Sequence, residues 1–170
     1  LVQIAWAQYD AVGCHIATTS FIAKPDGFDI PRDAQCIHGI STARAMADGT
    51  PLATVLPTLA DAVRNVDIIV AHNMQFDENV IAAEFMRQGI DIPFSGKHRI
   101  CTMVEATNFC HLPGQYGYKW PSLAELHATL FGEECSERHD AMADVMACAK
   151  CFFELKKRGA INIGLGRGFR

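Results

Sequence analysis

A short apolar run near the middle of the chain, Ile68-Ile69-Val70-Ala71, is the feature that most restricts its fold. The run follows Asp67, and a helical pattern over residues 76–88 comes soon after it and stops at Gly89. An apolar run this short is typical of a buried strand, because a membrane-spanning helix needs roughly 20 such residues. We therefore expect a central strand at residues 67–71 and a helix directly behind it.

The segments before this strand predict a hairpin and a helix. β-Branched and aromatic residues are frequent at residues 1–9 and 14–23, and the turn residues 10–13 separate the two runs. This pattern predicts an antiparallel hairpin. A helix is expected from Thr50-Pro51, with Thr50 as its cap and Pro51 in its first turn.

The segments after the central strand predict a further strand and two helices. We expect the strand at 99–103, a loop at 108–119, and helices from Ser122 to Phe131 and from about Asp140 to Lys157. The order β-β-α-β-α-β-α-α predicts an α/β fold with a mixed sheet and helices on both faces. We expect a single domain over residues 1–160 and a flexible, glycine-rich tail at 161–170.

Composition and charge exclude several classes of protein. Of the 170 residues, 49% are hydrophobic and 20% are charged, which is unlike a disordered chain. No long apolar run and no basic-then-apolar leader is present, so we expect no membrane contact and a cytoplasmic location. The net charge of -4 argues against a protein that coats duplex nucleic acid. It leaves room for an enzyme that holds a few nucleotides through metal ions.

The seven cysteines are an odd number, and reduced thiols are the simplest interpretation. Cys148-Ala-Lys-Cys151 has the spacing of a zinc-binding pair, but the chain offers no second pair with matching spacing. The pair also lies in a helical pattern, so we favour packing within the helix. A zinc-stabilised structural domain remains the alternative.

The segment from Ala71 to Asp77 lies where the central strand ends and a helix begins. Ligands of open α/β sheets bind at this edge, which makes Asp77 a candidate site residue. The ordinary alternative is that Asp77 favours the helix dipole and that Asn73 caps the helix. For this segment taken alone, we favour the ordinary alternative.

The segment from Arg138 to Asp144 lies at the start of the last long helix. His139 precedes the helix and Asp144 falls one turn inside it, among alanines that allow a close approach to the sheet. Asp140 and Asp144 share a helix face, where their charges repel unless a cation is present. Alternatively, Asp140 is the cap and Asp144 is a solvated surface residue.

Taken together, the two segments offer two carboxylates on separate helices and one imidazole. This set fits a phosphoryl-transfer site with two metal ions, and carboxylate oxygens suit Mg²⁺ or Mn²⁺. A histidine is a suitable general base for the attacking water, because its ordinary pKa is near 6.5.

The ordered motifs resemble those of the DnaQ-like DEDDh exonucleases, the family of the polymerase proofreading subunit and ribonuclease T. The resemblance covers residues 1 to about 155 and rests on three segments: Ile37-His38-Gly39-Ile40, His72-Asn73-x-x-Phe76-Asp77 and His139-x-Ala141-x-x-Asp144. It implies a ribonuclease H-like fold. It further implies that Asp77 and Asp144 bind two metal ions and that His139 is the general base. His38, Asn73 and Phe76 would contact the terminal nucleotide.

The same resemblance implies an activity and partners. We expect a metal-dependent 3′→5′ exonuclease that releases nucleoside 5′-monophosphates from single-stranded 3′ ends, with DNA favoured over RNA. A polymerase or replication complex is an expected partner. Two of the contact residues have ordinary alternatives: Phe76 in the core, which we favour, and His38 at the start of a helix.

The chain departs from the family at the first motif, D-x-E, which in the family lies on a strand just upstream of the one resembling residues 1–6. No D-x-E occurs in the front segment, and Asp10 stands alone in a turn. Because the chain starts with Leu1, we expect further residues upstream that carry this motif. The alternative is a catalytically inactive ribonuclease H-like module that binds nucleic acid or a polymerase.

The loop segment Gln115-Tyr116-Gly117-Tyr118-Lys119-Trp120 concentrates aromatic residues next to a cation. Such a loop could stack on bases and contact a phosphate. We favour the alternative, in which the loop packs its aromatic side chains onto the core.

Overall fold

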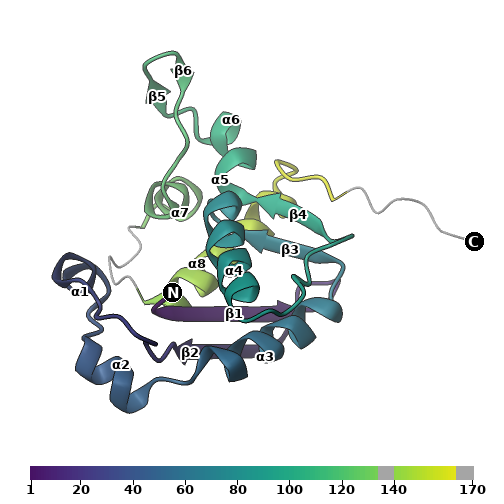
Figure 1. Ribbon diagram of the computed structural model, residues 1–170. Coiled ribbons are helices and arrows are strands. Elements are labelled where there is room, and N and C mark those ends of the chain that lie inside the picture. The colour runs from purple at the N-terminus through teal and green to yellow at the C-terminus, as the bar shows by residue number, and fades with distance from the viewer. Residues whose placement is uncertain (134–139, 164–170) are drawn as a thin grey trace, which may run out of the picture.

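The computed structural model describes residues 1–133 and 140–163 of the chain. Two short sheets form its central layer, and helices cover both faces of this layer (Figure 1). The α/β class predicted from the sequence is therefore confirmed. Within the described ranges, no helix is long and apolar enough to span a membrane.

The first sheet is the predicted hairpin. Strand β1 (Gln3–Tyr9) pairs antiparallel with β2 (His15–Ile22), with Ile4 opposite Phe21 and a register shift between Gln8 and Tyr9. The Asp10 carboxylate accepts hydrogen bonds from the backbone N–H groups of Val12 and Cys14, at 3.0 and 2.8 Å. This side chain therefore stabilises the turn that joins the two strands.

The second sheet contains the predicted central strand. Strand β3 (Ile68–Ala71) pairs parallel with β4 (His98–Cys101), and helix α4 (Met74–Arg87) crosses between them. Helix α4 begins two residues earlier than the pattern predicts. It stops before Gly89, whose φ of 63° suits glycine after a helix end.

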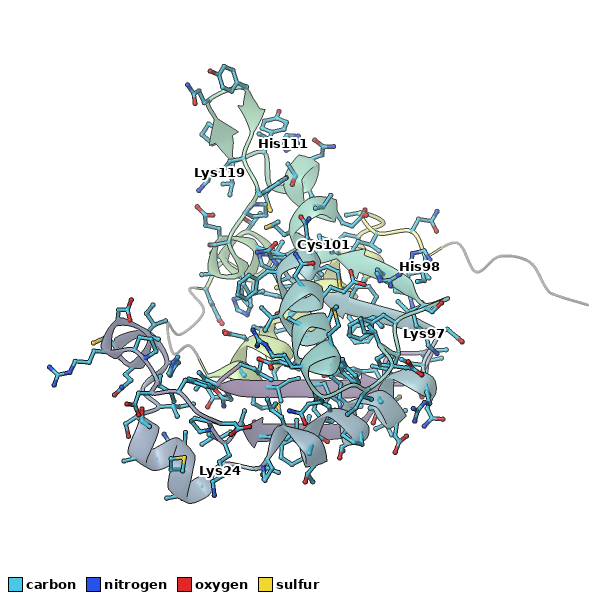
Figure 2. All side chains as sticks on the ribbon, in the orientation of Figure 1. Lys24, Lys97, His98, Cys101, His111 and Lys119 are labelled. Atoms are coloured by element: carbon cyan, nitrogen blue, oxygen red, sulfur yellow. The ribbon has the colours of Figure 1, made fainter. Side chains whose placement is uncertain are left out.

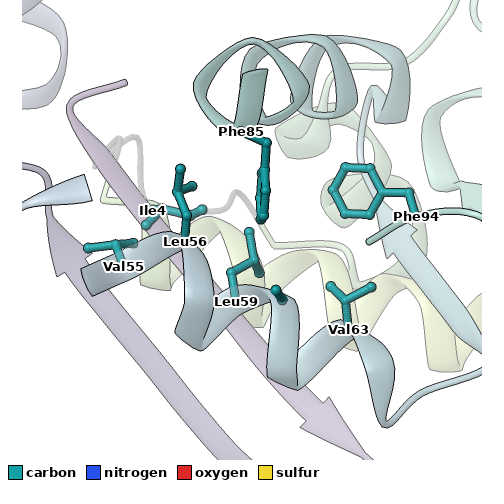
Figure 3. Close-up of a cluster of buried hydrophobic side chains, with 8 residues drawn as sticks. Ile4, Val55, Leu56, Leu59, Val63, Phe85 and Phe94 are labelled. Atoms are coloured by element: carbon teal, nitrogen blue, oxygen red, sulfur yellow. The ribbon is translucent and has the colours of Figure 1, made fainter. Parts of the chain in front are cut away.

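Side chains of β3 alternate between the two faces of the layer. Ile69 packs on one core cluster, whereas Ile68 and Val70 pack on the other. The first cluster joins β1 to helices α3 and α4, as Figure 3 shows around Leu56 and Phe85. Since both faces of this strand are covered, its sequence is a continuous apolar run.

Three helices connect the sheets. Helices α1 (Arg32–His38) and α2 (Thr42–Asp48) precede α3 (Leu52–Arg64). The cap position of α3 is Pro51 and no side chain caps it, so the predicted Thr50 cap is wrong by one residue. The isolated bridge of Thr50 to Ala23 explains this shift, because it holds Thr50 in an extended backbone conformation beside β2.

The segment after β4 is more structured than the loop predicted at 108–119. It forms helices α5 (Thr102–Glu105) and α6 (Thr107–Cys110), then a small hairpin of β5 (Pro113–Gly114) and β6 (Gly117–Tyr118). Helix α7 (Leu123–Phe131) follows, and Ser122 and Glu125 form a capping box at its start. The Ser122 prediction is therefore confirmed.

The last helix, α8 (Ala141–Lys157), also forms as predicted, with Asp140 as its cap. Cys148 and Cys151 are buried in it, as packing within the helix predicted. Ile161 is buried in the second core cluster, so any flexible tail begins later than predicted. Residues 164–170 of that tail lie outside the described ranges.

Helix α8 packs against both sheets. The rings of Phe153 and Tyr9 on β1 are 5.0 Å apart, while Leu155 belongs to the cluster that receives Ile68 and Val70 of β3. Among residues 1–133 and 140–163, no backbone pairing joins β1 to β3. One edge of each strand therefore has no strand partner within these ranges.

We predict that Phe85→Ala lowers the free energy of unfolding by about 3–5 kcal/mol, because the ring is fully buried where α4 meets α3. Met86, the next residue, is 72% exposed, and Met86→Ala should change this free energy by less than about 0.5 kcal/mol. Urea unfolding of the two variants measures both values. Equal losses would contradict the assignment of this core.

Candidate active site

The first turn of α4 carries Asp77 and Phe76 just beyond the end of β3. Asn73, which precedes the helix, has a φ of 66° and makes no capping hydrogen bond. It therefore occupies the cap position without capping, contrary to the ordinary alternative. Phe76 is 63% exposed, so its predicted place in the core is wrong: the first turn of α4 directs this ring away from both clusters.

His72 links this turn to two other segments. Its Nε2 atom donates to the carbonyl oxygen of Pro121 at 3.0 Å, since a carbonyl can only accept. Its Nδ1 atom then accepts from the hydroxyl of Thr102, also at 3.0 Å. Burial lowers the pKa of His72, and the bond to Pro121 partly opposes this shift. A neutral imidazole therefore joins the end of β3 to the start of α5 and to the segment before α7.

Asp77 is a half-buried carboxylate. Burial raises its pKa from 3.8 to about 6, because the charged form loses hydration there. A nearby cation would lower this pKa again. The position is therefore one where a bound positive ion would be favourable.

Asp144 lies in the first turn of α8, where it is exposed. Asp140 accepts hydrogen bonds from the N–H groups of Met142 and Ala143, which confirms it as the cap. The buried thiol of Cys148 lies one turn beyond Asp144.

The Cys148 thiol responds to the charges of both candidate metal ligands. Its pKa is raised to about 11, mainly by burial; a hydrogen bond with Thr102 opposes this shift, and the charges of Asp77, Cys101 and Asp144 add to it. Both carboxylates therefore disfavour the charged form of one buried thiol, although they lie on separate helices. That Asp77 and Asp144 bind metal ions together stays a prediction.

Two other predicted site residues have different positions. His139 lies outside the described ranges. His38 ends α1 and does not start a helix as the ordinary alternative predicted, because Gly39 terminates that helix with a φ of 70°. Its Nδ1 accepts from the N–H of Ile40, while its Nε2 is buried and has no hydrogen-bond partner among the described residues.

A divalent cation would find carboxylate ligands here, but few of them. Asp77 and Asp144 supply the hard oxygen ligands that Mg²⁺ and Mn²⁺ prefer. Within residues 1–133 and 140–163, no group of three or more histidine, cysteine or acidic side chains could hold a metal ion. The two carboxylates are therefore of the right chemical type for such ions, but they are a small set of ligands.

Sequence reasoning gave no role to the residues that support this site. His72 was noticed as part of a motif, but its partners Thr102 and Pro121 lie 30 and 49 residues further along the chain. The spacing of Cys148 and Cys151 gives no sign of the contact between the Cys148 thiol and the Thr102 hydroxyl. A buried threonine directly after a strand is the one local signal that could have indicated Thr102.

Comparisons with known proteins identify a matching family and structures of similar fold. The family model described as RNase T, exonuclease, matches residues 1–152. No curated protein sequence matches the chain.

Three solved structures resemble the chain. A structure of exonuclease I that addresses how processivity is achieved is 25% identical, with a TM-score of 0.75, and the match covers 92% of this chain and 37% of that one. E. coli exonuclease I in complex with a dT13 oligonucleotide is 26% identical, with the same TM-score and coverage. The zinc-bound form of an E. coli ExoI–ssDNA complex is 22% identical, has a TM-score of 0.72 and covers 93% and 41%, which supports the fold alone. The chain thus spans about two fifths of the length of these proteins.

We predict that Asp77→Asn changes how stability depends on pH in the metal-free protein. Between about pH 4 and 6 the native state holds more protons than the unfolded chain, so the free energy of unfolding should fall as pH rises. Asp77→Asn should remove this fall and be more stable above pH 6, by roughly 1–2 kcal/mol. Urea unfolding at several pH values in EDTA measures it. The same pH slope in both proteins would contradict the raised pKa.

Proposed function

The chain belongs to the RNase T exonuclease family, and we propose that it is a metal-dependent 3′→5′ exonuclease. It would remove nucleoside 5′-monophosphates from single-stranded 3′ ends, with DNA preferred over RNA. The observation that carries this proposal is the family match over residues 1–152, together with the position of Asp77 in the first turn of α4, just beyond the end of β3. We also propose a polymerase or replication complex as partner, from the family resemblance, and a cytoplasmic location, in which the cysteines would stay reduced.

Asp77 and Asp144 would hold two Mg²⁺ or Mn²⁺ ions. When bound, such ions act as Lewis acids on phosphate oxygens and lower the pKa of a water molecule. In our proposal His139 accepts the proton of the attacking water, whose oxygen bonds to the phosphorus of the last phosphodiester. The bond from this phosphorus to the 3′ oxygen of the preceding nucleotide breaks, and that oxygen takes up a proton.

Three further side chains would hold the terminal nucleotide. The exposed ring of Phe76 is next to Asp77 and offers a face for stacking. The side chain of Asn73 makes no capping bond, so its amide can bind a ligand. His38 has a buried Nε2 atom without a partner among the described residues, which fits a hydrogen bond to a nucleotide.

We also propose that a further strand, bearing the D-x-E motif, completes the sheet between β1 and β3. Each of these strands has an edge without a strand partner in the described ranges, and α8 packs on both. Two more acidic ligands would enlarge the small set around Asp77. Translation of the coding sequence upstream of Leu1 tests this, and a D-x-E followed by Thr-Gly is the expected result.

A catalytically inactive module that binds nucleic acid or a polymerase is the second candidate function. It is favoured by the lack of a three-ligand metal group in residues 1–133 and 140–163. Hydrolysis of an oligonucleotide by the full-length protein, abolished by EDTA, would exclude this candidate.

We predict that His139→Ala slows oligonucleotide degradation by the full-length protein at least roughly 100-fold, because a general base contributes about that much or more. Asp140→Asn is the matched control, since asparagine caps helices as well as aspartate. Initial rates on a labelled oligonucleotide measure both variants. If His139→Ala is as fast as the wild type, His139 is not the base.

A second prediction concerns metal binding without catalysis. At pH 7.5, Mg²⁺ or Mn²⁺ at about ten times its Kd should stabilise the wild type by about 1.4 kcal/mol. Asp77→Asn should gain much less, because it lacks one carboxylate, while Asp140→Asn should respond as the wild type does. Thermal unfolding at constant ionic strength measures this shift. Equal stabilisation of wild type and Asp77→Asn would contradict the ligand assignment.

A further inference from the structure

The segment from His111 to Trp120, which we name the aromatic hairpin, exposes three large rings. Tyr116 is 93% exposed, Tyr118 is 51% exposed and Trp120 is 65% exposed. The hairpin projects from the body of the molecule beyond α5, α6 and α7 (Figure 1), and Figure 2 labels His111 and Lys119 within it. The expectation that these aromatic side chains pack on the core is therefore wrong, because the strands carry them away from it.

The backbone of the aromatic hairpin is tightly paired. Pro113 lies opposite Tyr118 and Gly114 opposite Gly117, and the N–H of Lys119 donates to the carbonyl of Leu112 at 2.9 Å. A Cβ atom at Gly114 would lie 3.0 Å from the Gly117 carbonyl oxygen, so a side chain there would force the strands apart. The rings thus start from a fixed ribbon, which reduces the entropy lost when a ligand binds.

Each of the three exposed rings offers a face on which a base of any sequence can stack. Trp120 lies two residues after Tyr118, just beyond the end of β6. His111 contacts Tyr118 edge-on, with ring centres 4.7 Å apart, and so supports that ring.

The base of the aromatic hairpin is fixed to the candidate active site. The carbonyl of Pro121, next to Trp120, accepts the hydrogen bond from His72. His72 in turn lies five residues before Asp77, at the end of β3. The hairpin is therefore joined through Pro121 and His72 to the end of β3, after which α4 with Asp77 begins.

We propose that the aromatic hairpin binds single-stranded nucleic acid by stacking on bases upstream of the 3′ end. The placement of these bases upstream of the 3′ end rests on the proposed function, whereas the stacking itself does not. Lys119 forms an ion pair with Glu125 at 2.5 Å, which largely neutralises its charge. The affinity should accordingly come from the rings, with a small contribution from phosphate contacts.

The test is the binding of a labelled single-stranded oligonucleotide in EDTA, followed by fluorescence anisotropy at several salt concentrations. Tyr116→Ala, Tyr118→Ala and Trp120→Ala should each weaken binding roughly fivefold or more, with little change in the salt dependence. Tyr116→Phe and Tyr118→Phe are the matched controls and should keep the affinity, because they keep the ring. An oligonucleotide with abasic sites should bind all these proteins alike.

Two outcomes would overturn this proposal. If Tyr116→Ala and Tyr118→Ala bind the oligonucleotide as tightly as the wild type, the rings do not stack on bases. A surface for a protein partner would then be the better interpretation of the hairpin. Equal losses with the abasic oligonucleotide would indicate charge or folding effects in place of stacking. Tyr116 is so exposed that Tyr116→Ala should fold normally, which circular dichroism checks. The binding assay contains no metal and does not depend on hydrolysis. A protein that fails to hydrolyse oligonucleotides would therefore contradict the proposed activity but not the proposed stacking.

Discussion

The two hydrogen bonds of the His72 side chain are the interaction on which the arrangement of the site depends. They tie the end of β3 to Thr102 at the start of α5 and to Pro121 before α7. These segments are far apart in the chain, so their contact requires the parallel pairing of β3 with β4. Asp77 follows His72 in the chain, and the aromatic hairpin directly precedes Pro121.

Burial of charge explains why this junction is suited to cations. Asp77 loses hydration at the end of the sheet, which makes its ionised form less favourable than it is in water. Cys148 behind it is held as a neutral thiol by burial and by the charges of Asp77 and Asp144. A divalent ion beside Asp77 would offset the cost of its buried charge, so metal binding and the stability of this region are linked.

The sequence predicted those parts of the fold that follow from local pattern. The apolar run of β3, the hairpin of β1 and β2, and the Asp140 cap of α8 are local signals, and all three form. Exposure was harder to predict, because Phe76 and Tyr116 have side chains typical of cores and yet face solvent. Their exposure depends on the direction of α4 and of the small hairpin. The assignments of the metal ligands and of the general base rest on motifs, and the role of His139 as this base stays a prediction.

The measurement that tests the central claim most directly is the polarity of degradation. The full-length protein is incubated with Mg²⁺ or Mn²⁺ and a single-stranded oligonucleotide labelled at one end or the other. Exonuclease action from the 3′ end predicts that the 3′ label appears at once in a nucleoside 5′-monophosphate. The 5′-labelled strand should shorten step by step. Early release of a 5′-labelled mononucleotide, or no release of either label, would contradict the account.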